Sequence, residues 1–173
     1  MHITIVNGTT REGSNSIQVT NLLNKQIEQS TNSCSFVTLE NFKTIFTGEY
    51  TNLENATLEQ KTDIENIINA KIVIFVIPTY HHGMPGSLKN FFDIIDYKST
   101  NLYDKKVIGL VANNLEVDAI RQCRTVLDEI ISYYNFTSII PPKDCKIDPY
   151  NIDEKRLTEY VDYITTFANT FNP

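Results

Sequence analysis

The sequence predicts an α/β fold in which a doubly wound, five-stranded parallel sheet of order 2-1-3-4-5 forms the middle of three layers. Unbroken apolar runs such as Ile72–Ile77 are typical of strands that are buried on both faces of a parallel sheet. Segments with apolar residues at helical spacing alternate with these runs along the chain. Two polar loops, Asn7–Ser16 and Thr79–Gly86, follow predicted strands at the end of the sheet where ligands bind.

Length and composition indicate one globular domain spanning residues 1–173. Hydrophobic residues make up 41% and charged residues 21% of the chain, as in ordinary soluble proteins. The net charge is −6, so neither nucleic acid nor an anionic membrane surface is expected as a partner. No apolar run approaches the roughly 20 residues of a membrane-spanning helix. Three cysteines without a C-x-x-C pair indicate reduced thiols and a cytoplasmic protein.

The first strand is expected at His2–Val6, which is too short and too soon followed by polar residues for a signal peptide. A helix begins inside the next loop, where Ser14, Asn15 or Ser16 can cap it. The predicted buried face of that helix consists of Val19, Leu22, Leu23 and Ile27.

The loop between this strand and helix has the chemistry of a phosphate-binding loop. Gly8 and Gly13 permit tight turns with inward N–H groups, and a helix N-terminus favours an anion. Arg11 is the only cation of the loop. A polar turn with a solvated arginine is the alternative interpretation. The glycine fingerprint of dinucleotide-binding folds and the Walker motif are both absent, so neither of those phosphate sites is expected.

The second strand is expected at Ser35–Leu39, before the polar, irregular segment Glu40–Ala56. This segment either covers the mouth of the site or crosses the sheet edge, and we favour the second. Thr57 and Gln60 have the spacing of a capping box, so a helix starts there and leads into the central strand.

The central strand is followed by a loop rich in aromatic, imidazole and glycine residues. Pro78 ends the strand because it has no N–H to donate. The next helix is expected to begin near Pro85–Ser87. Its apolar face consists of Leu88, Phe91, Phe92 and Ile95. Strand, loop and helix therefore form one βα unit with a candidate ligand site at the end of its strand.

The last third of the chain supplies two further strands and two helices. Lys106–Ala112 is expected to be a buried strand, and Phe136–Ile140 a short fifth strand that ends at Pro141. Ala119–Tyr134 has the spacing of a long amphipathic helix, and a final helix is predicted from about Asp153.

Two blocks of the sequence resemble the NADPH-dependent FMN reductase family. The block that resembles the family's flavin-edge loop and following helix is Pro78-x-Tyr80, Gly83-x-Pro85-Gly86-x-Leu88-Lys89-Asn90 and Asp93. The block that resembles its phosphate loop, G-[ST]-x-R-x-x-S, consists of Gly8, Thr9, Arg11 and Ser14. Relatives often have a glycine-rich stretch after the fourth strand, where this chain has Asn113 and Asn114. The resemblance implies a flavodoxin-like fold with both loops at one flavin site.

The resemblance also implies FMN as the cofactor, with NADPH or NADH as co-substrate. It places Thr9, Arg11, Ser14, Asn15 and Ser16 around the FMN phosphate. It assigns the contacts with the flavin ring to Pro78, Thr79, Tyr80, His81, His82 and Gly83. The amides of Asn113 and Asn114 offer donors and acceptors to the pyrimidine edge, although asparagine is also common in loops.

The activity implied is hydride transfer from NAD(P)H through FMN to a small electron acceptor, namely a quinone, an azo compound, chromate or free flavin. NAD(P)H and acceptor are expected to use one open face in turn, which predicts ping-pong kinetics. No catalytic acid or base is assigned to the protein, because the cofactor carries the difficult chemistry. Family members commonly pair through the helix at Ser87–Asp96, so a homodimer or tetramer is expected. Phe91, Phe92 and Ile94 extend the apolar surface of this helix, and the alternative is that both phenylalanines lie in the core of the monomer.

Two other functions stay open at this point. A flavodoxin-type electron carrier has no pyridine-nucleotide site, and such carriers usually have a T-x-T-G-x-T loop without arginine. A flavin-binding module without catalysis is the other alternative. A metal site at His81 and His82 is not expected, because no third ligand with suitable spacing is evident. Cys123 lies on an apolar helix face and is expected in the core rather than as a nucleophile.

Overall fold

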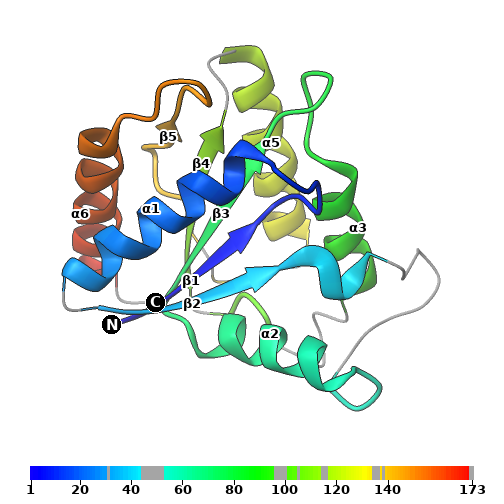
Figure 1. Cartoon of the computed structure of the whole chain (residues 1–173). Helices are drawn as coiled ribbons and strands as arrows, with labels where there is room; N and C mark the ends of the chain where they lie inside the picture. Colours follow the sequence, from blue (N-terminus) through cyan, green and yellow to red (C-terminus); the bar gives the residue numbers. More distant parts are fainter. Residues whose placement is uncertain are drawn as a thin grey trace.

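A parallel sheet with helices on both faces forms the fold (Figure 1). The computed structural model describes residues 1–30, 32–43, 53–95, 101–104, 106–113, 117–133, 137 and 139–171. The strands are β1 (His2–Asn7), β2 (Ser33–Thr38), β3 (Ile72–Pro78), β4 (Val107–Asn113) and β5 (Cys145–Lys146). The helices are α1 (Asn15–Gln29), the 3-10 helix η1 (Leu39–Phe42), α2 (Leu58–Asn69), α3 (Gly86–Ile94), α5 (Val117–Tyr133) and α6 (Glu154–Thr170).

The five strands pair in parallel in the order β2-β1-β3-β4-β5, which confirms the predicted fold class and strand order. β1 pairs with β3 as far as Asn7 and Val76, and β3 with β4 as far as Pro78 and Asn113. The last residues of β1, β3 and β4 therefore lie along one edge of the sheet, which is the edge where the sequence predicts a site.

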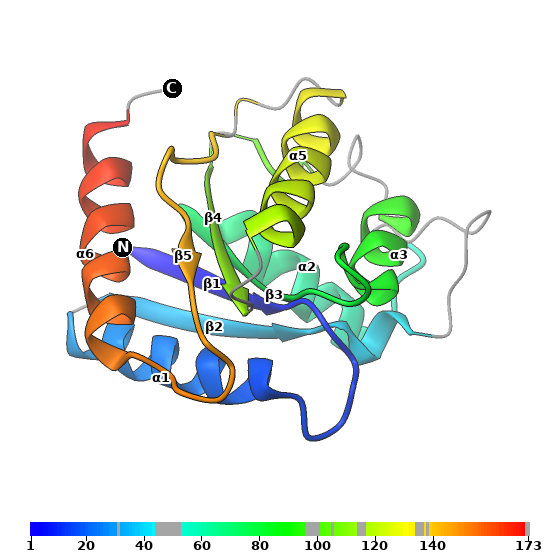
Figure 2. The same cartoon turned by 90° about the horizontal axis from the view of Figure 1, so that it is seen from above.

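The side chains of the central strand divide between two hydrophobic layers. Phe75 lies in the layer formed with α2, α3 and α5, whereas Ile74 lies in the layer formed with α1 and α6. Figure 2 shows these helices on the two sides of the sheet. Every residue of β3 and of β4 is buried, as expected for inner strands of a sheet covered on both faces.

Three of the predicted helix starts have side-chain caps. The Ser14 hydroxyl oxygen accepts a hydrogen bond from the N–H of Ser16 at 3.1 Å. Thr57 and Gln60 form the complete capping box, with N–O distances of 3.3 and 2.9 Å. Asp153 caps α6. Of the three candidates at α1, Ser14 is therefore the cap, and the helix starts directly after the predicted phosphate loop.

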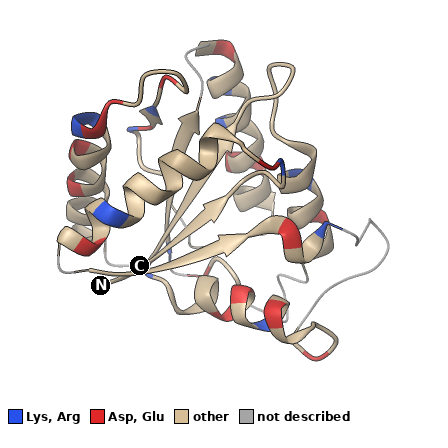
Figure 3. Ribbon diagram, viewed as in Figure 1, with Lys and Arg blue, Asp and Glu red and all other residues tan. Residues whose placement is uncertain are grey.

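Charged residues lie on the helices and loops rather than on the long strands. Figure 3 shows β1 to β4 in tan, because none of these strands contains a charged residue. Acidic positions are spread along the outer helices, including α2 and α6. In the described part of the chain, no helix is both long and apolar enough to cross a membrane.

The fifth strand is not where the sequence predicts it. Among the described residues 137, 139 and 140 of the predicted strand at Phe136–Ile140, only Ile139 pairs with the sheet, through an isolated bridge to Val107. After Ile139 the chain stops pairing with β4. It pairs with this strand again as the two-residue strand β5, opposite Val111 and Ala112. Two consecutive prolines, Pro141 and Pro142, have no N–H to donate and prevent a continuous ladder.

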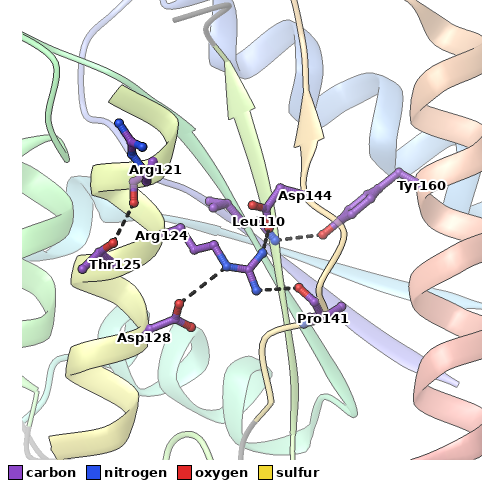
Figure 4. A network of polar contacts seen from close by, with 8 residues as sticks. All are labelled: Leu110, Arg121, Arg124, Thr125, Asp128, Pro141, Asp144 and Tyr160. Atoms are coloured by element: carbon purple, nitrogen blue, oxygen red, sulfur yellow. Dashed lines mark hydrogen bonds and ion pairs between the residues drawn. The ribbon is translucent and has the colours of Figure 1, made fainter. Parts of the chain in front are cut away.

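Side chains make the polar contacts between the Ile139 bridge and β5, where the chain does not pair with β4 (Figure 4). The N–H of Leu110 donates to the hydroxyl oxygen of Tyr160 at 2.8 Å. Arg124 of α5 forms an ion pair with Asp144 and donates to the carbonyl oxygen of Pro141 at 2.8 Å. Arg124 therefore holds the segment that leads into β5, and Tyr160 of α6 gives the N–H of Leu110 in β4 a partner.

The apolar side chains proposed for a dimer interface lie in the core of the same chain. Phe91 and Ile94 are 0% exposed and Phe92 is 6% exposed. Phe91 makes an edge-on ring contact with Phe42, with centroids 5.1 Å apart, and Phe92 packs against Phe75. The prediction that these residues provide an apolar surface is therefore wrong. Residues 44–52 of the segment predicted to cross the sheet edge lie outside the described residues.

Candidate functional site

A cavity of about 510 Å³ opens at the carboxyl ends of β1, β3 and β4. This volume lies within the range of small-molecule and cofactor sites. The described residues that line the cavity are Arg11, Gly13, Ser14, Asn15, Ser16, Pro78, Thr79, Tyr80, Asn113, Pro149 and Tyr150. They come from the loops after β1 and β3, from the end of β4 and from the loop after β5.

One wall of the cavity has a positive character. Arg11 is the only charged residue among the described lining residues, and its exposed side chain makes no ion pair within the described part of the chain. The first turn of α1 contains no acidic residue, so the positive end of the helix dipole is not neutralised there. This wall suits an anionic group such as a phosphate.

Hydrogen bonds join the first predicted site loop to β3, to α3 and to the second loop. The N–H of Gly8 donates to the carbonyl oxygen of Val76 at 2.9 Å, and the Ser87 hydroxyl donates to the Gly8 carbonyl oxygen at 3.1 Å. The hydroxyl groups of Thr9 and Tyr80 lie 3.0 Å apart. A Cβ atom at Gly8 would lie 2.8 Å from the Val76 carbonyl oxygen, so glycine is required for this approach. The loops meet at one site, as predicted.

The loop after β3 turns sharply at two histidines. His81 and His82 have φ values of 48° and 62°, the positive values that a two-residue type I′ turn requires. The N–H of Tyr80 donates to the Gly83 carbonyl oxygen at 3.1 Å, and the reverse bond is 3.0 Å long. These two amides therefore have partners within the turn. Both imidazoles are exposed and lie outside the described lining of the cavity.

Asn113 presents a buried acceptor at the cavity. The residue is 6% exposed, and its amide nitrogen donates to the Ser16 hydroxyl oxygen at 3.3 Å, which links β4 to α1. Its side-chain oxygen has no hydrogen-bond partner among the described residues. A buried acceptor without a partner costs about 1–3 kcal/mol. An O–H or N–H of a ligand in the cavity would satisfy it.

The cavity lining includes eight of the twelve residues predicted for cofactor binding, and it lies apart from Thr9, His81, His82 and Gly83. Thr9 is 3% exposed. Its hydroxyl forms a hydrogen bond with the Tyr80 hydroxyl and accepts one from the N–H of Arg11. The cofactor contacts of all twelve residues stay predictions, and Asn114 lies outside the described residues.

Sequence reasoning missed the lining residues Pro149 and Tyr150. Both residues follow the last strand at the end of the sheet where ligands bind, and this position could have predicted them. That signal was lost because the fifth strand was predicted at Phe136–Ile140.

Residues 1–142 match the NADPH-dependent FMN reductase family. The chain belongs to this family. It is an NAD(P)H-dependent oxidoreductase that uses FMN as cofactor and NAD(P)H as co-substrate. The predicted family, cofactor and enzyme class are thereby confirmed.

Solved structures with the same fold include oxidoreductases and a flavodoxin. An oxidoreductase from Corynebacterium diphtheriae superposes with a TM-score of 0.75 at 12% identity, covering 99% of this chain and 98% of that one. The flavoenzyme NAD(P)H:(acceptor) oxidoreductase FerB from Paracoccus denitrificans gives 0.67 at 17% identity, covering 97% and 95%. Flavodoxin 1 from Bacillus cereus gives 0.60 at 8% identity, covering 99% and 100%. At these identities the likeness concerns the fold alone.

The residues around the cavity fit the FMN of this family. The wall with Arg11 and the start of α1 has the charge that a phosphate monoester needs. The side-chain oxygen of Asn113 is the unpaired acceptor that a ribityl hydroxyl or a ring N–H can fill. Pro78 and Tyr80 offer flat or apolar surface for a ring system.

The buried thiols lie apart from the described lining of this cavity. Cys123 is 0% exposed, which confirms its predicted place in the core. Burial raises the pKa of the Cys123 thiol to about 11 and that of Cys145 to about 12, so both stay protonated and poorly nucleophilic near neutral pH. No group of three or more His, Cys, Asp or Glu side chains that could hold a metal ion occurs among the described residues.

Proposed function

We propose that the cavity at the ends of β1, β3 and β4 binds FMN and that the enzyme passes reducing equivalents from NAD(P)H to a quinone, azo compound, chromate or free flavin. The observation that carries this proposal is the meeting of Arg11, the start of α1 and the Pro78–Tyr80 loop around one cavity. One loop suits an anion and the other suits a flat ring, as FMN requires.

In this proposal each part of the lining has a separate role. Arg11 and the hydroxyls of Ser14 and Ser16 hold the phosphate, with Asn15 at the first helical position beside them. Asn113 accepts a hydrogen bond from the ribityl chain or the ring, which satisfies its buried oxygen. The Pro78–Tyr80 loop supports the ring and is held in place by the Thr9–Tyr80 hydroxyl contact.

Bound FMN supplies the acceptance and donation of hydride, so the protein needs to bind and orient its substrates and to leave one side of the cavity open. We propose that NAD(P)H and the acceptor occupy this open side in turn. His81 and His82 lie at an exposed turn outside the described lining of the cavity. The proposal therefore assigns no proton transfer to a protein side chain.

Initial-rate kinetics test the alternation of substrates. NADPH oxidation is measured at several fixed concentrations of a soluble quinone, then repeated with NADH. Parallel lines in double-reciprocal plots are expected, because only one of the two substrates occupies the open side at a time. Intersecting lines, together with binding of both substrates at once, would contradict the shared site. Oxidation of NADPH by the protein alone at the rate seen with quinone would contradict the role of the acceptor.

We further propose a cytoplasmic enzyme that assembles as a homodimer or tetramer, as the family resemblance implies. Because Phe91, Phe92 and Ile94 are buried in the monomer, the interface has to use other surfaces than the apolar face of α3. Sedimentation velocity at micromolar concentration measures the state of assembly. A single monomeric species over this range would contradict the proposal.

A further inference from the structure

We infer that Tyr150, in the loop after β5, contacts the flavin, with its aromatic ring packed against the isoalloxazine or the adjoining ribityl chain. The inference rests on the proposed function, because it needs FMN in the cavity. It adds a residue that neither the family motifs nor the loops after β1, β3 and β4 include. The cavity lining and the exposure of the side chain carry it.

The backbone on both sides of Tyr150 is anchored. Ile147 is 1% exposed, and its N–H donates to the carbonyl oxygen of Ala112 at 2.9 Å. The residue after Ala112 in β4 is Asn113, which lines the cavity. On the other side, Ile152 packs against the hydrophobic layer formed with α1 and α6. Tyr150 therefore stands between two fixed points, next to the end of β4.

A compact turn holds the residue itself. Asp148 and Asn151 form an antiparallel bridge, with the N–H of Asn151 donating to the Asp148 carbonyl oxygen at 3.3 Å. The N–H of Tyr150 donates to the Asp148 carboxylate at 2.9 Å, which is an Asx turn. Figures 1 and 2 both show the loop after β5 beside the N-terminal end of α1, where the phosphate wall lies.

The side chain of Tyr150 is exposed, and the residue lines the cavity. Tyr150 is 92% exposed, although both of its neighbouring anchors are buried or half-buried. A fixed backbone with an exposed aromatic ring at the rim of a cavity binds a flat ligand at little entropic cost, because tyrosine has only two rotatable side-chain bonds. The rest of the rim near α1 consists of small polar residues and Arg11, which offer no such surface.

The expected ligand contact uses the face of the ring and not the hydroxyl. Stacking of a flat heterocycle on an aromatic side chain is tolerant of a missing hydroxyl. We therefore expect Tyr150→Phe to keep the wild-type affinity for FMN and Tyr150→Ala to lose it by about five- to thirtyfold. Riboflavin affinity should fall by the same factor in Tyr150→Ala, since the contact does not involve the phosphate.

The test is a titration of apo-protein with FMN and with riboflavin, followed by quenching of flavin fluorescence. Wild type, Tyr150→Ala and Tyr150→Phe are compared with Tyr133→Ala. Tyr133 is a matched control because it is 80% exposed at the end of α5 and lies outside the described lining of the cavity. The thermal midpoint of each apo-protein is measured alongside. Because the Tyr150 ring is exposed, its removal should leave that midpoint unchanged.

The outcomes separate the inference from the proposed function. If wild type binds FMN and Tyr150→Ala binds both flavins as tightly, the inference is overturned while the proposed function stands. If Tyr150→Phe also loses flavin affinity, the contact is made by the hydroxyl, and the inference is overturned. If Tyr150→Ala loses affinity for FMN but not for riboflavin, the contact is with the phosphate, and the inference is overturned as well. If wild type binds neither flavin, the proposed function fails and the inference fails with it.

Discussion

The cavity has two walls that are held in place by different kinds of contact. The loops after β1 and β3 extend from strands of six and seven residues that pair along their length with neighbouring strands. Pro149 and Tyr150 follow a strand of two residues. The side chain of Arg124 holds the segment before this strand, and the Tyr160 hydroxyl accepts a hydrogen bond from Leu110 of β4 (Figure 4). Backbone pairing defines the first wall, and tertiary side-chain contacts define the second.

This difference predicts that the two walls respond to different substitutions. A change at an exposed position of α1 or α3 leaves the pairing of β1 and β3 intact, because main-chain hydrogen bonds do not depend on side chains. A change at Tyr160 or Arg124, in contrast, removes the hydrogen bond that the side chain makes to Leu110 or to Pro141. The following substitutions test this comparison, from the largest expected effect to the smallest.

Replacement of Tyr160 by phenylalanine should have the largest effect on stability. It leaves the buried N–H of Leu110 without a partner, which costs about 1–3 kcal/mol of unfolding free energy. Urea unfolding of apo-protein measures this loss. Tyr163→Phe, a half-buried residue on the same helix, serves as the control and should change the unfolding free energy by less than about 0.5 kcal/mol. An equal, small change in both variants would show that the hydroxyl does not replace strand pairing.

Arg124→Met should lower the unfolding free energy by about 1–2 kcal/mol, because Asp144 and the Pro141 carbonyl oxygen both lose a charged donor. The side chains of Arg124 and Asp144 are 23% and 14% exposed, so solvent screens this pair only in part. FMN affinity should also fall a few-fold, since the segment leads to Tyr150.

Arg121→Met is the control for this substitution. Arg121 lies on the same helix with a side chain that is 72% exposed, and its pair with Asp118 is at the surface. Its loss should cost less than about 0.5 kcal/mol. Unfolding by urea and FMN titration are carried out on both variants. If Arg124→Met destabilises the protein without weakening FMN, the second wall does not depend on this contact.

The smallest effect on the cavity is expected at the amino end of the sheet, where Lys106 is 4% exposed and donates to the carbonyl oxygen of Ala70 at 2.9 Å. Burial lowers the pKa of Lys106 to about 8 from its ordinary 10.5. Between these two pH values the unfolded chain binds more protons than the folded chain, so the contribution of Lys106 to stability rises with pH.

Relative to Lys106→Met, the unfolding free energy of wild type should therefore increase by about 2–3 kcal/mol between pH 7 and pH 10. Urea unfolding of both proteins across this range gives the difference. FMN affinity at fixed pH should be the same in both, since Lys106 lies at the opposite end of β4 from the cavity. A difference that stays constant with pH, or falls, would contradict the lowered pKa.

The sequence predicts the first wall well because its signals are local. The buried runs of β1 and β3 set the strand ends, and Gly8, Arg11 and Pro78 then fall at those ends with their chemistry evident. The second wall depends on contacts between distant residues. No local pattern shows that the Tyr160 hydroxyl bonds to Leu110, 50 residues away, or that Arg124 reaches Pro141. The short β5 and the contribution of Tyr150 were missed for this reason.

The left-handed turn at His81 and His82 could not be predicted from the sequence either. Two-residue turns of this kind usually contain asparagine, aspartate or glycine, so two histidines give no turn signal. The buried position of Phe91 and Phe92 likewise depends on tertiary packing, here against Phe42 and Phe75. An apolar helix face alone does not tell whether it meets its own sheet or another subunit.

The most direct test of the account is the affinity of Arg11→Ala for FMN and for riboflavin, measured by titration of apo-protein. Arg11 is the only charged residue among the described lining residues, so it should bind the group that FMN has and riboflavin lacks. Loss of a hydrogen bond to a charged group predicts about a ten- to hundredfold weaker affinity for FMN and an unchanged affinity for riboflavin. Equal FMN affinity in wild type and Arg11→Ala, with Arg121→Ala as the surface control, would contradict the assignment of this cavity to FMN.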